Sequence, residues 1–88
     1  MTRTDTVSQE LTIIPGVGKN VAQHLMDVGI TSVAGLRGQD AEHLYELSNL
    51  RAGHRQDRCL LYVFRCAVYY AEGGREPEKL KWWNWKDV

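Results

Sequence analysis

The residues best suited to chemistry lie in the segment IIPGVGKN, from Ile13 to Asn20. Pro15 stops a short apolar run because it cannot continue a helix, and Gly16 and Gly18 allow backbone dihedrals that a side chain would forbid. Apolar residues then recur at helical spacing from position 21 onward, so we expect Gly18 to open a helix whose first N–H groups have no internal partner. These free donors, the positive helix end and Lys19 together favour an anion, so the segment predicts a site for one phosphate oxygen.

The run PGVGKNVA, preceded by a helix-like stretch and followed by Gly29, resembles the helix-hairpin-helix motif, in which the hairpin grips the nucleic-acid backbone without reading sequence. The resemblance implies a DNA-phosphate-binding set made of Gly16, Val17, Gly18, Lys19 and Asn20. It also implies that the carbonyls of Thr12, Ile14 and Val17 can hold a monovalent cation that bridges to the phosphate. The alternative is a structural helical hairpin that binds nothing, or binds protein.

Composition limits how strong any DNA binding can be. The 88 residues are expected to form one domain, residues 1–88, and the formal net charge is zero, so there is no chain-wide basic field. Residues 1–50 carry six acids and three bases, whereas residues 51–88 carry eight bases and five acids. We therefore expect weak, non-specific DNA binding, with any basic face built mainly by the second half.

The chain carries no sign of export or membrane insertion. No apolar run approaches the ~20 residues that span a bilayer, and the N-terminal MTRTDTVSQE lacks a secretory core. The sequence predicts a cytoplasmic protein without membrane contact.

Cysteine and histidine positions give little support for catalysis or metal binding. Cys59 and Cys66 are expected to be buried thiols on one helix, about 10 Å apart along its axis and too far apart to bridge. His54 with Asp57, or with Cys59, lies near a predicted helix start, where a thiol pKa could be lowered. GVGKN lacks the Walker spacing and the three histidines are scattered, so we predict no enzyme, no side-chain metal site and no cofactor apart from the hairpin cation.

Hydrophobic periodicity predicts an all-α, compact bundle of about five helices. The hairpin is expected over about 8–29, with a frayed lead-in before it and its first helix over about 8–14. Packing helices follow over about 31–51, where Asp40 caps a helix whose inward stripe consists of Ala41, Leu44, Leu47 and Leu50. The longest helix is expected over about 54–72, and a docked tail over about 77–88.

Two groups of side chains in the second half could contact a partner. Arg51, Arg55 and Arg58 form the denser basic cluster and are the predicted secondary phosphate contacts. A stripe at spacings of four and three runs along the long helix and consists of Arg58, Tyr62, Arg65, Tyr69 and Glu72. This stripe either touches nucleic acid or protein, or is a boundary whose arginines pair with Glu42, Glu46 or Asp57.

The C-terminal EKLKWWNWKDV holds three tryptophans within four positions, which is too much apolar area to leave in water. We expect this tail to dock on the long helix and close the core, in which case Trp83→Ala would cost several kcal/mol, within the ~3–5 typical of large aromatic truncations. A base-stacking platform or a partner-binding tail are the alternatives.

A second resemblance covers nearly the whole chain. Through GHRQDRC and WWNWKD the sequence is similar to the small bacterial pathogenicity-locus family, whose members are often labelled mitomycin resistance proteins, and more distantly to the C-terminal domain of TfoX-type competence regulators. These resemblances imply a compact helical domain with a helix-hairpin-helix. The leading hypothesis is a sequence-independent DNA-binding module that acts as a homodimer or with a partner supplying a second hairpin. The rival is a protein-interaction domain that uses the stripe or the tail.

Overall fold

The computed structural model describes residues 3–86, and over this range all regular elements are helices, with no strand. Four α-helices are joined by three short 3-10 helices, in the order α1 (Arg3–Leu11), α2 (Lys19–Asp27), η1 (Ala34–Leu36), α3 (Ala41–Ala52), α4 (Cys59–Ala71), η2 (Pro77–Leu80) and η3 (Trp82–Trp85). The radius of gyration is 12.0 Å, as expected for a compact chain of this length. The predicted all-α class is therefore confirmed.

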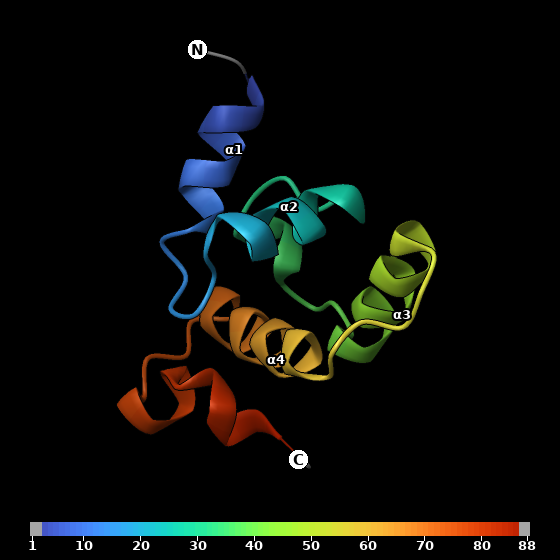
Figure 1. Ribbon diagram of the computed structural model, residues 1–88. Coiled ribbons are helices and arrows are strands. Elements are labelled where there is room, and N and C mark those ends of the chain that lie inside the picture. Colours follow the sequence, from blue (N-terminus) through green and yellow to red (C-terminus); the bar gives the residue numbers. More distant parts are fainter. Residues whose placement is uncertain (1–2, 87–88) are drawn as a thin grey trace.

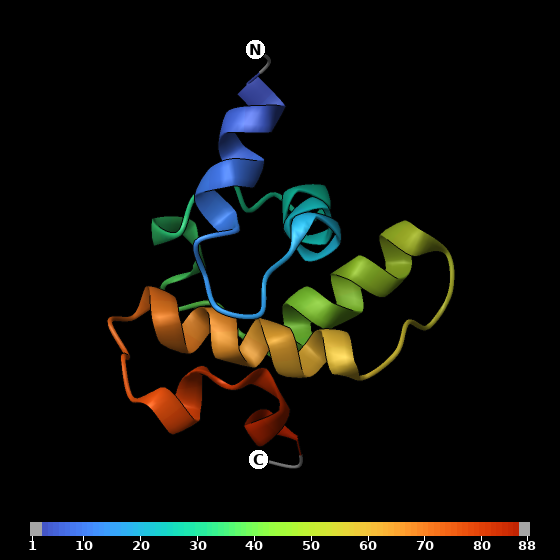
Figure 2. The same cartoon turned by 60° about the vertical axis from the view of Figure 1, so that its left-hand side comes forward.

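Helix α4 lies at the centre of the molecule (Figures 1 and 2). The α1–α2 loop lies on one side of it, the C-terminal segment η2–η3 lies on the other, and α3 packs against its N-terminal half. Phe64 on α4 is completely buried, as are Leu11, Leu25 and Leu36 from the surrounding elements. A helix contacted from several sides needs apolar residues around most of its circumference, which explains the run CLLYVF at its start.

Helix α1 begins and ends earlier than predicted. It starts at Arg3 rather than near Ser8, because Val7 and Leu11, four residues apart, form its inward face. It ends at Leu11 rather than near Ile14, since a residue that precedes proline is pushed out of the helical region, and Ile14 precedes Pro15. Ile14 still reaches the core, where 1 % of it is exposed.

Helix α4 is also shorter than the helix predicted over 54–72, because it starts at Cys59. Gly53 adopts a left-handed conformation with φ of 77° and ends α3, whose N-terminus is capped by Asp40 as predicted. The connection that follows is held by side chains: Asn49 Oδ1 accepts from the Gln56 N–H at 2.9 Å, and Gln56 Nε2 donates to Ser48 Oγ at 2.9 Å. This network of satisfied hydrogen bonds stabilises a loop at residues for which the hydrophobic periodicity alone predicts a helix.

The inward face of α3 also differs from the prediction. Leu44 is buried as predicted, but the other buried residues are Tyr45 and Ser48, and Leu50 is 77 % exposed. The α3–α4 loop determines which face of α3 turns inward, because Ser48 and Tyr45 both hydrogen-bond to Gln56.

The C-terminal tail lies along α4, held by Arg65, whose Nη1 donates to Trp85 O at 2.7 Å, and by Trp85 Nε1, which donates to Lys79 O at 2.7 Å. Trp82 packs against the core, but Trp83 is 51 % exposed. The tail therefore packs on α4 and the core through Trp82, and the large stability cost expected for Trp83→Ala does not apply to this half-exposed ring. No helix within residues 3–86 combines the length and apolar character needed to cross a bilayer.

Candidate nucleic-acid interface

The loop between α1 and α2 is built by tight backbone turns. Val17 N–H donates to Ile14 O at 3.0 Å, and Gly16 takes a φ of 85°, in the left-handed region that glycine adopts without strain. Val17 is 4 % exposed, so its side chain anchors the loop while its neighbours face solvent. Of the three carbonyls assigned to a monovalent cation, those of Thr12, Ile14 and Val17, the Ile14 oxygen already accepts this turn bond.

Gly18 is the N-cap of α2, with extended backbone at φ −91° and ψ −173° and no side-chain cap. The first bond back to the loop runs from Ala22 N–H to Gly18 O at 2.9 Å, so the N–H groups of the first turn have no partner inside the helix. A Cβ added to Gly18 would meet no atom within 4 Å, and Lys19 and Asn20 are exposed. This corner of the molecule presents backbone donors, a helix dipole and one full positive charge to solvent.

Gly16 has a different environment from Gly18. A Cβ at Gly16 would come within 3.0 Å of Trp82 Cδ1, so the loop and the C-terminal tail are in direct contact there. Cys66 lies beneath both segments, with its Sγ 3.9 Å from Pro15 O and 3.6 Å from Lys79 O. Trp82 is a loop neighbour that sequence reasoning missed, because the contact joins distant segments and leaves no local signal.

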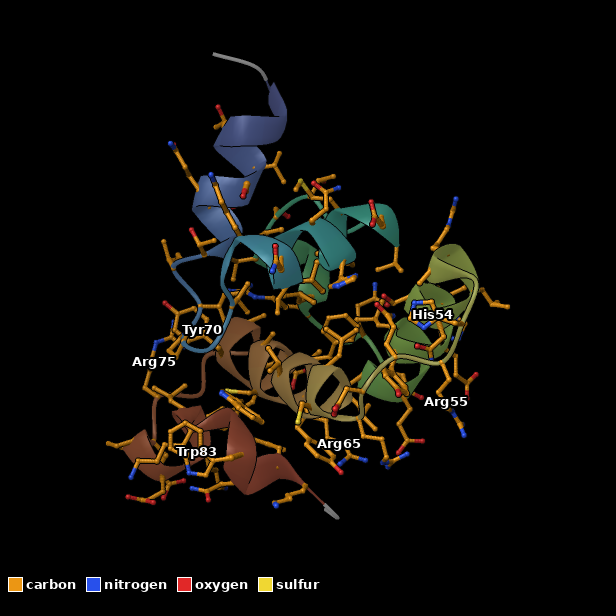
Figure 3. The ribbon with its side chains drawn as sticks, viewed as in Figure 1. His54, Arg55, Arg65, Tyr70, Arg75 and Trp83 are labelled. Carbon is orange, nitrogen blue, oxygen red and sulfur yellow. The ribbon has the colours of Figure 1, made fainter. Side chains whose placement is uncertain are left out.

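The predicted secondary contacts lie away from this loop. Arg51 is in the last turn of α3, Arg55 in the α3–α4 loop and Arg58 at the N-cap of α4, so they do not share one helix. Figure 3 places Arg55 on the opposite side of the ribbon from the α1–α2 loop. The structure therefore does not join the basic cluster to the predicted phosphate site in one surface.

The arginine and tyrosine stripe is largely engaged within the molecule. Arg65 pairs with Glu42 at 3.0 Å, with 12 % of its side chain exposed, which confirms one of the predicted ion pairs. The ring of Tyr69, also in the stripe, lies 5.5 Å from the ring of Trp85, and the Glu72 carboxylate accepts from the Gly38 N–H at 3.1 Å. Between the tail and the start of α3 these side chains border a groove of about 590 Å³.

The residues considered for catalysis are differently placed than expected. Cys66 is buried, but Cys59 is exposed, and both thiols are free. The pKa of Cys59 is raised, chiefly because its thiol hydrogen-bonds the Asp57 carboxylate, so the expectation of a lowered thiol pKa is wrong. Burial raises the pKa of Cys66. Within residues 3–86, no three His, Cys, Asp or Glu side chains gather at a point where they could share a metal ion.

This geometry defines a class of small helical domain in which a helix N-terminus, preceded by glycines, is open to solvent. The chain belongs to the pathogenicity locus family, whose sequence model matches residues 4–88, and this confirms the family resemblance. It is also similar to Mitomycin resistance protein McrB of Streptomyces lavendulae, at 39% identity over 82 residues that cover 93% of this chain and 75% of the relative. No solved structure matches the chain.

Proposed function

We propose that this chain is a non-catalytic, cytoplasmic DNA-binding module in which a helix-hairpin-helix, formed by α1, α2 and their loop, grips one backbone phosphate without reading sequence. The observation that carries the proposal is the N-terminus of α2. Its first amides lack partners inside the helix, the space at Gly18 is open, and Lys19 and Asn20 in the same first turn are exposed. Phosphate contacts of this kind position a protein on DNA and carry no sequence information.

The charge of the whole chain sets the strength of this interaction. With a formal net charge of zero, one loop supplies only a small electrostatic attraction. A homodimer, or a partner that carries a second hairpin, would address both strands and raise the affinity through linkage. The Arg51, Arg55 and Arg58 cluster is too far round the molecule to reinforce the same loop, so we assign it a role in long-range attraction only.

The relative named for mitomycin resistance suggests a setting for this activity. We extend that name to the present chain only in the sense of a role exerted through DNA, which follows from the phosphate binding proposed above.

The test is fluorescence anisotropy of labelled duplex, single-stranded and branched DNA at ~50 and ~200 mM salt. Gly18→Glu should abolish binding, because the open space above the glycine becomes occupied by a carboxylate that repels phosphate. Lys19→Ala should weaken binding to all sequences alike. Thr31→Glu, which makes the same charge change at an exposed position beyond the far end of α2, is the control and should bind as the wild type does.

A protein-interaction domain is the second candidate, and a specific surface favours it. Leu50 is 77 % exposed and borders a hollow of about 530 Å³ together with Glu46, Asn49, Gly53, His54 and Arg55. A large exposed apolar side chain beside a hollow is typical of protein contacts. If folded wild-type protein fails to bind any DNA at ~50 mM salt, this surface becomes the leading candidate.

A further inference from the structure

Trp83 is an exposed aromatic ring held in a fixed position. It is 51 % exposed, yet it follows Trp82, which packs against the core, and belongs to the helical turn η3. Its ring meets that of Trp82 edge to face, with centroids 5.7 Å apart and planes at 87°. Such a contact restrains the direction of the outer ring, about half of which stays exposed to solvent.

The proposed phosphate loop is separated from Trp83 by a single indole ring. The Cβ position of Gly16 lies 3.0 Å from Trp82 Cδ1, and Trp82 in turn contacts Trp83. The buried Cys66 touches the backbone of both the loop and the tail, so the two segments share one support. Figure 3 shows Trp83 on the tail, across α4 from α2, so the close approach of Gly16 and Trp82 is what joins the loop to the tail. The loop and the exposed ring are therefore linked through Trp82, and a flexible strand can reach both around this contact.

The surroundings of Trp83 favour a negatively charged ligand. Residues 79–86 read KLKWWNWK, with three lysines and no acid. Lys79 and Lys81 pair with Glu76 and Glu78 at 3.4 and 3.1 Å, but all four side chains are largely exposed. Exposed pairs contribute little to stability, so these lysines can exchange a carboxylate for a phosphate at small cost.

We propose that Trp83 stacks on an unpaired base of a DNA strand whose backbone phosphate occupies the α1–α2 loop, so that single-stranded segments are the preferred ligand. The proposal rests on the phosphate binding proposed above and adds the substrate class. In a duplex each base is covered by its stacked neighbours, whereas an unpaired base can place its face on an aromatic ring. Stacking of this kind tolerates any sequence, as the proposed function requires.

The experiment compares a duplex with a single-stranded oligonucleotide of one sequence, using anisotropy of the labelled DNA and quenching of tryptophan fluorescence at ~50 mM salt. Wild type should bind the single strand more tightly. Trp83→Ala should weaken single-strand binding about fivefold or more and leave duplex binding unchanged, since one stacked base is worth roughly that factor at least. Trp83→Phe should restore much of the loss, and Leu50→Ala, an exposed apolar truncation elsewhere, should change neither.

Three outcomes separate the claims. Loss of single-strand preference in Trp83→Ala, with loss of all binding in Gly18→Glu, supports a composite site. If wild type and folded Trp83→Ala bind the single strand with equal affinity, the stacking proposal is overturned. If Gly18→Glu still loses binding in that case, the proposed phosphate site stands on its own. Absence of binding to both DNAs by folded wild type overturns both proposals.

Discussion

At the scale of single residues, two glycines of one short motif have separate physical roles. Gly16 needs its φ of 85° and lies against Trp82, whereas Gly18 has ordinary extended backbone and open space around it. We expect Gly16→Ser to cost about 1–3 kcal/mol of unfolding free energy through backbone strain and crowding. Gly18→Ser should change stability by less than about 0.5 kcal/mol, because serine is a good N-cap. Urea unfolding of the pair measures both values, and equal costs would contradict this division.

Asp57 gives a residue-scale prediction about pH. Its Oδ1 accepts from the Cys59 N–H at 2.8 Å, and this backbone bond is the main reason why its pKa is lowered from 3.8. A lowered folded-state pKa means that the stabilisation is complete above the ordinary pKa and is lost as pH falls through the lowered value. Asp57→Asn keeps an acceptor but cannot titrate. The Tm advantage of wild type over Asp57→Asn should therefore shrink from about pH 6 to about pH 2, and a constant difference would argue against this role.

At the scale of elements, the sequence predicted what depends on neighbours in the chain. The break at Pro15, the start of α2 after Gly18 and the Asp40 cap follow from local chemistry. The exposed Leu50 and the late start of α4 depend instead on the Gln56 network, which closes through side chains that no periodicity encodes. Local rules therefore located the candidate phosphate loop but not its contact with the tail.

The tail offers the sharpest element-scale prediction, because two adjacent tryptophans differ in burial. Trp82→Ala removes a ring that packs on the core and against Gly16, and should cost about 2–4 kcal/mol with a clear drop in Tm. Trp83→Ala removes a half-exposed ring and should cost less than about 1 kcal/mol. Thermal unfolding followed by circular dichroism measures both. The opposite order would mean that the tail docks through Trp83.

At the scale of the whole molecule, a net charge of zero provides no overall basic field, so DNA binding depends on local phosphate contacts. One loop that neutralises one or two phosphates predicts a slope of roughly −1 to −2 for log affinity against log salt on duplex DNA, and a dimer roughly doubles it. Salt titration combined with sedimentation of the free and bound protein measures the slope and the stoichiometry together. A slope near zero would exclude backbone phosphate as the main contact, and a steep slope from a monomer would require the distant arginine cluster as well.

The central claim is that the first amides of α2 hold the phosphate, and an NMR titration of ¹⁵N-labelled protein with single-stranded DNA at ~50 mM salt tests it most directly. The account predicts that the largest amide shifts occur at Gly18, Lys19 and Asn20, with the Trp83 indole N–H moving alongside them. Shifts concentrated around Leu50 and Arg55, with the α2 start unmoved, would contradict it and place the contact on the α3–α4 surface instead.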